Sequence, residues 1–309
     1  MAMLKKLLMW ILVLTCVVFL LQTFIRFHGD KFVKLSELYF DTNNQDRING
    51  NGSMMTSQFG CKRNVGFLKS PKPFVALASF HGSGNTWTRE LLEDLTGIYT
   101  GSLYLDPHFN MTGSGRCPLL GEVYIIKTHQ AKDDITSSTC EPSLMKNLTI
   151  YDKAIFILRN PFDAFVAEFN RRKGGGKHSG LAKQEHFKSK GWENYVKGAL
   201  KRWRKTILYW ITAFDKPRHI LVYEKLIENQ RDELTKLADF LQVDDATQNI
   251  NCMMSEVKDR NKREKPDWLK KENLFNDELR ESINAVLEQL LQNDEMELVH
   301  KTIQGYLYK

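Results

Sequence analysis

Three short polar segments carry the residue types from which a binding or catalytic site can be built. Lys127 and His129 are a cation and a titratable imidazole two residues apart, and an extended backbone directs both to the same side. Arg159 precedes Asn160-Pro161, and its guanidinium can clamp a phosphate through two parallel hydrogen bonds. Residues 81–87 read His-Gly-Ser-Gly-Asn-Thr-Trp. Together the three segments predict a site for an anionic ligand beside a group that can take up a proton.

The glycine-rich segment has the pattern of a turn that opens a helix. The backbone N–H groups at such a helix start can hold a phosphate or a sulfate. No lysine precedes Thr86, so the segment does not match the Walker A pattern, and an ATPase or GTPase is disfavoured. Two plainer interpretations stay open at this point: a tight turn without a ligand, and a solvated Lys127 beside a loop His129.

The elements that must position these segments form an alternating pattern. Apolar runs at residues 74–80, 123–127, 154–159 and 219–223 are interleaved with helical patterns that begin near residues 86 and 162, and with a long one at residues 192–214. This alternation predicts an α/β fold, a mostly parallel sheet flanked by helices. Ligands of open α/β sheets bind at the carboxyl ends of the strands, where all three segments lie.

The N-terminal part of the chain predicts a membrane anchor. Residues 7–25 hold no charged side chain and span roughly 28 Å as a helix. A cleaved signal peptide has a shorter apolar core and a small-residue cleavage site, which residues 22–26 do not offer. We therefore expect a cytoplasmic tail at residues 1–6, a transmembrane signal anchor at 7–25, a polar stem at 26–70 and a lumenal domain at 71–309.

Sequons and cysteines indicate on which side of the membrane the body lies. The basic residues flanking the span do not decide its orientation, but Asn51, Asn110 and Asn147 are potential N-glycosylation sites C-terminal of it. This favours a single-pass type II protein with a lumenal body. With Cys16 in the span, an even set remains for disulfides, with three possible pairings: Cys61, Cys117, Cys140 and Cys252. No zinc spacing occurs, so we expect no metal.

Composition sets broader limits. The chain is 42% hydrophobic and 26% charged, which excludes disorder or a miniature disulfide scaffold as a description of the whole. Lys and Arg number 44 against 37 Asp and Glu, a net charge of +7. Such a surface favours anionic ligands or an anionic membrane surface, and it does not by itself indicate nucleic acid, which we do not expect as a partner.

In their order along the chain, the three segments resemble those of the PAPS-dependent sulfotransferases. Soluble members of that family carry P-K-S-G-T-T-W, K-T-H and R-N-P, and this chain has the last two unchanged. Its first loop is closer to the S-F-P-G-S-G-N-T-W of the WSC-domain sulfotransferase-like (sialate O-sulfotransferase-like) group. The likeness covers about residues 73 to 290. The four cysteines outside the span are too few for WSC modules, which we expect to be absent.

The resemblance implies a P-loop-like sulfotransferase fold and a role for each matching residue. His129 takes the acceptor proton and Lys127 neutralises charge on the transferring sulfonyl group. Arg159 binds the 3′-phosphate of PAPS, Trp87 stacks on adenine, and Tyr223 lies near adenine. The loop residues that hold the 5′-phosphosulfate are Gly82, Ser83, Gly84, Asn85 and Thr86. Lys262 and Arg263, in a late basic segment, close over the 3′-phosphate unless that segment is only a solvated charge run.

Three departures from the family pattern alter these expectations. Gly82 stands where soluble members have the loop lysine, so its charge must come from Arg89 or Lys127. Ala167 replaces a phosphate-binding serine, and Asn170, one helical turn further on, is the expected substitute. His81 stands where the WSC-related pattern has proline.

These observations predict a Golgi sulfotransferase that moves a sulfonate from PAPS to a hydroxyl of a glycan or glycoprotein. Two alternatives stay open. Asp133-Asp134 and Asp244-Asp245 are acidic pairs of the kind found in metal-dependent lumenal glycosyltransferases. A catalytically inactive glycan-binding scaffold of the same fold is the other alternative, although the retention of Lys127 and His129 argues against it.

Overall fold

The computed structural model describes residues 64–104, 112–113, 117, 120–131, 151–175, 180–255 and 266–308. The chain divides into two units, Met1–Met54 and Met55–Lys309, and every element below belongs to the second. Within the described ranges, no helix is long and apolar enough to cross a membrane. Several predicted features lie outside the described residues: the span at residues 7–25, the three sequon asparagines Asn51, Asn110 and Asn147, and Lys262 and Arg263.

The described residues form a parallel sheet of five strands in the order β2-β3-β1-β4-β5. The strands are β1 (Phe74–Ser79), β2 (Gly101–Ser102), β3 (Ile125–Thr128), β4 (Tyr151–Leu158) and β5 (Arg218–Val222). The central strand is β1, where Leu77 pairs with Lys127 of β3 and with Ile155 of β4. The predicted mostly parallel α/β sheet is confirmed.

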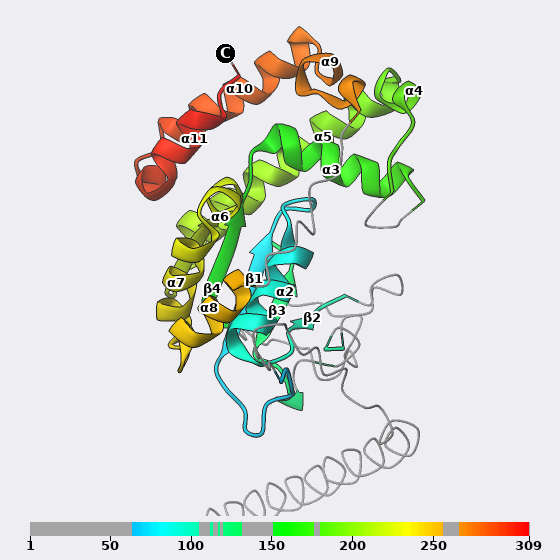
Figure 1. Ribbon diagram of the computed structural model, residues 1–309. Coiled ribbons are helices and arrows are strands. Elements are labelled where there is room, and N and C mark those ends of the chain that lie inside the picture. The colour runs from blue at the N-terminus through cyan, green and yellow to red at the C-terminus, as the bar shows by residue number, and fades with distance from the viewer. Residues whose placement is uncertain are drawn as a thin grey trace, which may run out of the picture. The chain divides into compact units, whose positions relative to one another are not determined.

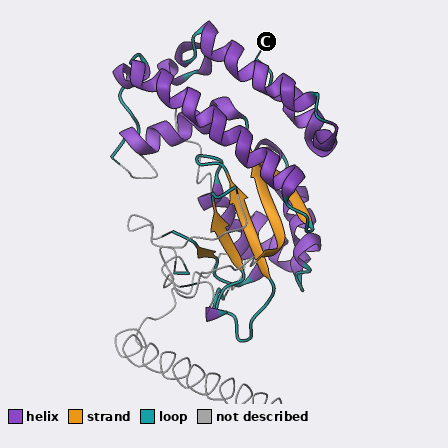
Figure 2. Ribbon diagram, turned by 180° about the vertical axis from the view of Figure 1, so that it is seen from behind, coloured by secondary structure: helices purple, strands orange, loops and turns teal. Residues whose placement is uncertain are grey.

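Helices cover both faces of this sheet (Figures 1 and 2). The helices that contribute most to the packing are α2 (Asn85–Thr96), α3 (Pro161–Lys173), α5 (Lys190–Leu208), α7 (Gln230–Leu241), α8 (Ala246–Ser255), α10 (Asp277–Leu291) and α11 (His300–Tyr306). Shorter elements connect them: α4 (Gln184–Phe187), the π-helical η3 (Tyr209–Ala213), α6 (Tyr223–Glu228), η4 (Asp267–Leu269), α9 (Lys271–Leu274) and η5 (Asp294–Val299).

The alternation of side chains along the strands separates two hydrophobic cores. On one face, Val75 and Leu77 of β1 pack with apolar residues of α2, α7 and α8. On the other face, Ala76 and Ala78 pack with apolar residues of α3, α5, α10 and α11. Strands buried on both faces appear in the sequence as continuous apolar runs rather than alternating ones, as predicted for residues 74–80.

The long helix α5 carries Trp192 and Trp203, and η3, which follows it directly, carries Trp210. Trp192, Trp203 and Trp210 are each 1% exposed. The Trp203 indole N–H donates to the backbone oxygen of Arg159 (3.3 Å), and that of Trp210 donates to the backbone oxygen of Gln130 (3.0 Å). A buried indole N–H needs such a partner, and here it fixes the segments that follow β4 and β3.

Several element boundaries differ from the predicted ones, and two of the differences are instructive. β4 begins at Tyr151 instead of residue 154, and the helix expected over residues 192–214 ends at Leu208 before passing into η3. In this last turn Phe214 N donates to Tyr209 O. Apolar periodicity alone does not distinguish an α-helix from such a widened turn, because both keep the same side chains buried.

Candidate functional site

All of the predicted site segments that the structure describes follow the carboxyl ends of neighbouring strands. The glycine-rich loop follows β1, Lys127 is the penultimate residue of β3 and His129 follows that strand, Arg159 follows β4, and Tyr223 follows β5. Because these strands are parallel, their ends meet at one edge of the sheet. The fold therefore gathers residues that are up to about 140 positions apart in the sequence.

Two glycines give the loop between β1 and α2 its shape. Gly82 and Gly84 have φ angles of +77° and +88°, a region that residues with a Cβ rarely adopt. A Cβ on Gly82 would lie 2.9 Å from the backbone nitrogen of Glu168 in α3, and one on Gly84 would lie 2.7 Å from Cδ2 of Tyr223. Gly84 provides no side-chain cap for α2, which leaves the first turn suited to an anion.

Arg159 is held against this loop. Its Nη1 donates to the backbone oxygen of Gly82 (2.6 Å), and its guanidinium carbon lies 4.1 Å from the centroid of the Tyr223 ring. The Tyr223 ring in turn meets Trp87 edge-on, with centroids 5.9 Å apart. The structure thus brings together Gly84, Trp87, Arg159 and Tyr223, four of the residues that the resemblance assigned to one ligand.

Buried polar atoms test whether this cradle fits a phosphorylated ligand. Ser83 is 1% exposed, and its Oγ has no hydrogen-bond partner among the described residues; the buried Nε of Arg159 has none there either. A buried donor without a partner is costly, at roughly 1–3 kcal/mol. A hydroxyl and a guanidinium N–H beside a helix start are the donors that phosphate or sulfate oxygens require. The donor set fits a phosphate or sulfate group of the kind that PAPS carries.

The imidazole of His129 is fixed in one tautomer by the end of β1. Its Nδ1 lies 2.8 Å from the backbone oxygen of Ser79. A carbonyl oxygen only accepts hydrogen bonds, so Nδ1 carries the proton and Nε2 is left with the lone pair. The backbone N–H of His129 donates to the hydroxyl of Tyr104 (2.8 Å), which fixes the position of the residue itself.

The surroundings of His129 keep its ring neutral. Burial lowers its pKa well below the ordinary value of 6.5, and the electrostatic interactions with His81 and with the Lys127 ammonium lower it further. The His81 ring stacks on the His129 ring with centroids 4.1 Å apart and an interplanar angle of 29°. Lys127 lowers the pKa of His129, as predicted, but burial and the interaction with His81 lower it more. A neutral imidazole with a free Nε2 can act as a base.

Three other predicted residues make contacts with the protein. The Asn85 amide donates to the Leu77 backbone oxygen (3.1 Å), and the Asn170 amide oxygen accepts from the Ala182 backbone (3.0 Å). Arg89 donates to the Thr100 hydroxyl (2.7 Å). Ligand roles for Asn85 and Asn170 stay predictions. Arg89 and Lys127 are the two cations expected to supply the charge of the missing loop lysine: Arg89 is bound to Thr100, whereas the charge of Lys127 lowers the pKa of His129.

Glu168 of α3 is bound by two arginines. Both of its oxygens accept from Arg171 (2.7 and 2.8 Å), and Arg172 adds a third contact of 2.7 Å. Burial raises the pKa of the Glu168 carboxyl, but the hydrogen bonds from the two arginines outweigh burial, and the net pKa is lowered. Glu168, Arg171 and Arg172 together carry a net charge of about +1, and Glu168 lies against Gly82 of the glycine-rich loop.

Two site contacts have no counterpart in the sequence reasoning. Glu224 accepts the Asn160 backbone N–H through Oε1 (2.9 Å) and the Tyr306 hydroxyl through Oε2 (2.8 Å). The C-terminal helix α11 is therefore linked to the segment that carries Arg159. Glu224 follows Tyr223 directly and could have been found as its neighbour, whereas Tyr306 has no local signal.

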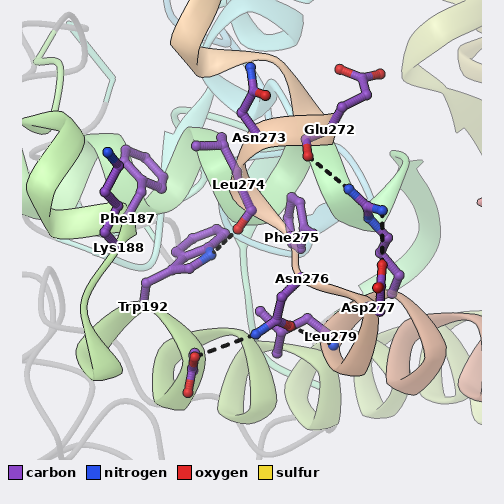
Figure 3. Close-up of a pocket in the computed structure, with 12 residues that line it drawn as sticks. Phe187, Lys188, Trp192, Glu272, Asn273, Leu274, Phe275, Asn276, Asp277 and Leu279 are labelled. Carbon is purple, nitrogen blue, oxygen red and sulfur yellow. Dashed lines mark hydrogen bonds and ion pairs between the residues drawn. The ribbon is translucent and has the colours of Figure 1, made fainter.

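A cavity of about 400 Å³ lies elsewhere, between α4 and α5 on one side and the α9–α10 segment on the other (Figure 3). Its floor includes Trp192, whose indole N–H donates to the Leu274 backbone oxygen (2.6 Å). None of the predicted site residues that the structure describes lines this cavity. It belongs to the packing of the helical layer.

The match to a family model agrees with this site. Residues 72–295 match the model of the sulfotransferase domain, and the chain belongs to that family. Similar proteins include the WSCD family members CG9164 of Drosophila melanogaster, 35% identical over 189 residues, and AAEL009094 of Aedes aegypti, 35% identical over 191 residues. The alignments cover 60% and 58% of this chain and 55% and 54% of those proteins. The chain spans about half the length of these relatives, and the predicted resemblance to the WSC-related group is confirmed.

Solved structures with a similar arrangement include mouse sulfotransferase SULT7A1 complexed with PAP, with a TM-score of 0.46 and 18% identity over 77% of this chain and 91% of that one. Another is retinol dehydratase in complex with androsterone and PAP, with a TM-score of 0.45 and 15% identity over 72% and 81% of the two chains.

Proposed function

We propose that this protein transfers a sulfonate from PAPS to a hydroxyl group of a glycan. The observation that carries the proposal is the junction at the sheet edge, where Gly84, Arg159 and Tyr223 are in contact beside a neutral His129. When bound, PAPS supplies an activated sulfonate joined to a phosphate. The residues of this chain must then hold a dianionic phosphate group, orient the donor and remove one proton from the acceptor.

Donor binding is assigned to the residues around the loop. The turn at Gly82, Ser83 and Gly84, with the helix start at Asn85 and Thr86, faces the 5′-phosphosulfate, and Arg159 faces the 3′-phosphate. Trp87 and Tyr223 offer aromatic surface to adenine. The unpartnered Ser83 Oγ and Arg159 Nε support this assignment. Lys262 and Arg263 keep their predicted role at the 3′-phosphate and lie outside the described residues.

Acceptor activation is assigned to His129. A hydroxyl is a poor nucleophile at neutral pH, and a base that removes its proton as the new bond forms contributes about 10²- to 10⁴-fold. The tautomer fixed by Ser79 leaves Nε2 to accept that proton. Lys127 places a positive charge beside the same ring, where it offsets negative charge on the group being transferred.

Location and acceptor class are part of the proposal. The apolar stretch at residues 7–25, the three sequons and the net charge of +7 support a single-pass type II protein of the Golgi membrane that acts on glycans or glycoproteins. Cys117 and Cys252 each take part in a disulfide, which suits an oxidising lumen. Protease digestion of the body in sealed, right-side-out microsomes would contradict this placement.

The glycosyltransferase alternative receives no support from Asp244 and Asp245. They lie between α7 and α8 and not at the carboxyl end of a strand. Among the described residues, no three His, Cys, Asp or Glu side chains gather as metal ligands do. The expectation that no metal is needed stays a prediction, and so does the absence of a nucleic-acid partner.

Transfer of labelled sulfate from PAPS to a panel of glycans by the purified full chain tests the proposal directly. The expected result is transfer to at least one acceptor, with PAP binding measured by calorimetry on the same sample. PAP binding without transfer to any acceptor would favour the scaffold. Binding of a nucleotide sugar with a divalent metal, and not of PAP, would favour the glycosyltransferase.

A further inference from the structure

The loop between β1 and α2 brings a second imidazole onto the first. The ring of His81 lies on that of His129 with centroids 4.1 Å apart, and the two planes are within 29° of parallel. These histidines follow different strands, β1 and β3, so the contact depends on the tertiary fold. The Tyr104 ring is also nearly parallel to that of His129, at an angle of 17° and a centroid distance of 5.6 Å.

The position of His81 is fixed from both sides. Phe80 before it is 4% exposed and packs edge-on against Phe165 of α3, with centroids 5.6 Å apart. Gly82 after it lies so close to α3 that any Cβ would collide with the backbone there. Because the residues on both sides of His81 are fixed in this way, its ring has little freedom to move off His129.

We propose that His81 is a positioning residue, which covers one face of the His129 ring and thereby keeps that ring neutral and oriented. The inference rests on the proposed function of His129 as the base. His81 itself has no assigned contact with the donor or the acceptor. Its role is to exclude water from a ring whose Nδ1 is already tied to Ser79, so that Nε2 alone stays open to a proton.

The charged groups around the pair explain why both rings stay neutral. Burial lowers the pKa of His81 to about 4. Glu168 on α3 raises it, while the charges of Arg171 and Arg172 on the same helix and of Lys127 on β3 lower it. Tyr104, another titratable neighbour of the pair, has a raised pKa, mainly because it is buried, and it carries no charge near neutral pH. The positive groups outnumber the one carboxylate, and a second positive charge on stacked rings is unfavourable.

This arrangement has a functional consequence. An unperturbed imidazole is half protonated near pH 6.5 and loses its capacity as a base below that value. With its face covered by His81, His129 remains a base in mildly acidic solution. The activity should then persist at pH values where an exposed histidine would already be protonated.

Per-residue exchange of the imidazole C2 hydrogen with deuterium, followed by mass spectrometry of the full chain across a pH series, tests the inference. The midpoint of the exchange profile reports the pKa of each histidine and needs no activity. We expect His81→Ala to raise the His129 midpoint by about one pH unit or more toward 6.5, because water then reaches the ring. His81→Phe keeps an aromatic cover and removes only the electrostatic interaction with His81, so its His129 midpoint should rise less than that of His81→Ala.

His219 of β5 provides an internal control in the same digests, because burial lowers its pKa and neither substitution touches it. An unchanged His219 midpoint shows that a variant is folded, and if His81→Ala fails this control, His81→Ser takes its place. A His129 midpoint that is the same in wild type and in the small-residue variant would overturn the inference. A rise in His81→Phe equal to that in His81→Ala would also overturn it, since covering would not be the cause.

Turnover measurements separate this inference from the proposed function. If both hold, the acid limb of the pH profile moves up in His81→Ala by the same amount as the exchange midpoint. If the protein transfers sulfonate to no acceptor, the exchange midpoints still decide whether His81 controls His129. An exchange shift without any shift of the acid limb would show that His129 is not the base.

Discussion

Replacement of Gly84 by alanine tests how the loop, Tyr223 and Arg159 depend on one another. Alanine at this position has two separable costs. The backbone at φ +88° is unfavourable for a residue with a Cβ by roughly 1–2 kcal/mol. The new Cβ would also lie 2.7 Å from Cδ2 of Tyr223, closer than van der Waals contact allows, so the ring must move.

Movement of the Tyr223 ring removes its contact with Arg159, whose guanidinium carbon is 4.1 Å from the ring centroid. A cation–π contact of this kind contributes about 0.5–2 kcal/mol. If that contact helps to fix Arg159 for the donor, its loss should weaken PAP binding by a similar amount, or about 2- to 30-fold in Kd.

Gly175 offers a matched control for the backbone cost. Its φ is +86°, but a Cβ there would meet nothing within 4 Å. We expect Gly175→Ala to lower the free energy of unfolding by about 1–2 kcal/mol and to leave the PAP affinity unchanged. Gly84→Ala should be destabilised further and should bind PAP more weakly. Denaturant unfolding and calorimetry with PAP measure the two effects.

A double-mutant cycle identifies the source of the additional effect. In a Tyr223→Ala background the ring is gone, so Gly84→Ala should cost only as much stability as Gly175→Ala does. If Gly84→Ala costs the same with and without the ring, the collision with Tyr223 is not the cause. Equal PAP affinity of the two glycine variants would refute the link from Gly84 through Tyr223 to the donor.

Three further substitutions have expected outcomes. Arg159→Ala should weaken PAP binding by about 1.5–3 kcal/mol, or roughly 10- to 150-fold, and unchanged affinity in calorimetry would assign the 3′-phosphate to another cation. Tyr306→Phe removes the hydroxyl that donates to Glu224. We expect the free energy of unfolding to fall by about 0.5–1.5 kcal/mol and the affinity for PAP to fall measurably. A loss of stability with unchanged PAP affinity would show that α11 does not influence the donor site. His129→Ala should retain PAP binding and lose about 10²- to 10⁴-fold in turnover, and normal turnover would move the base elsewhere. The pKa of His129 in the folded chain lies below 6.5, so below that pH the unfolded chain takes up a proton on this residue while the folded chain does not. The free energy of unfolding should therefore decrease as the pH falls below 6.5. The decrease should be less steep in His129→Ala, and unfolding titrations across a pH series measure it.

Much of the site could be predicted because its signals are local. Asn160 and Pro161 illustrate this: proline takes the first turn of α3, and the Asn160 side chain accepts from the Phe162 N–H (3.0 Å) to cap the helix. Such patterns need only neighbouring residues. Because parallel strands all end at one edge, correct placement of each segment at a strand end was enough to bring the segments together.

The directions of individual side chains could not be predicted in the same way. Asn85 belongs to the glycine-rich motif, yet its amide bonds to the Leu77 backbone and to the Ser79 hydroxyl, both at 3.1 Å. Both acceptors are in β1 below the loop. A motif states which residue types are present, whereas the direction of each one depends on which unsatisfied acceptor is nearest after the strand and helix have packed.

Arg159 shows the general reason why sequence reasoning stops where it does. Its backbone oxygen is held by Trp203, 44 residues later, and the next residue is held by Glu224, 64 residues beyond it. Glu224 is held in turn by Tyr306, a further 82 residues along the chain. The sequence suggests only that Trp203 and Tyr306 are core residues, and both are buried. They nevertheless determine where the guanidinium lies, because a flexible side chain can select one ligand geometry only when its backbone is immobile.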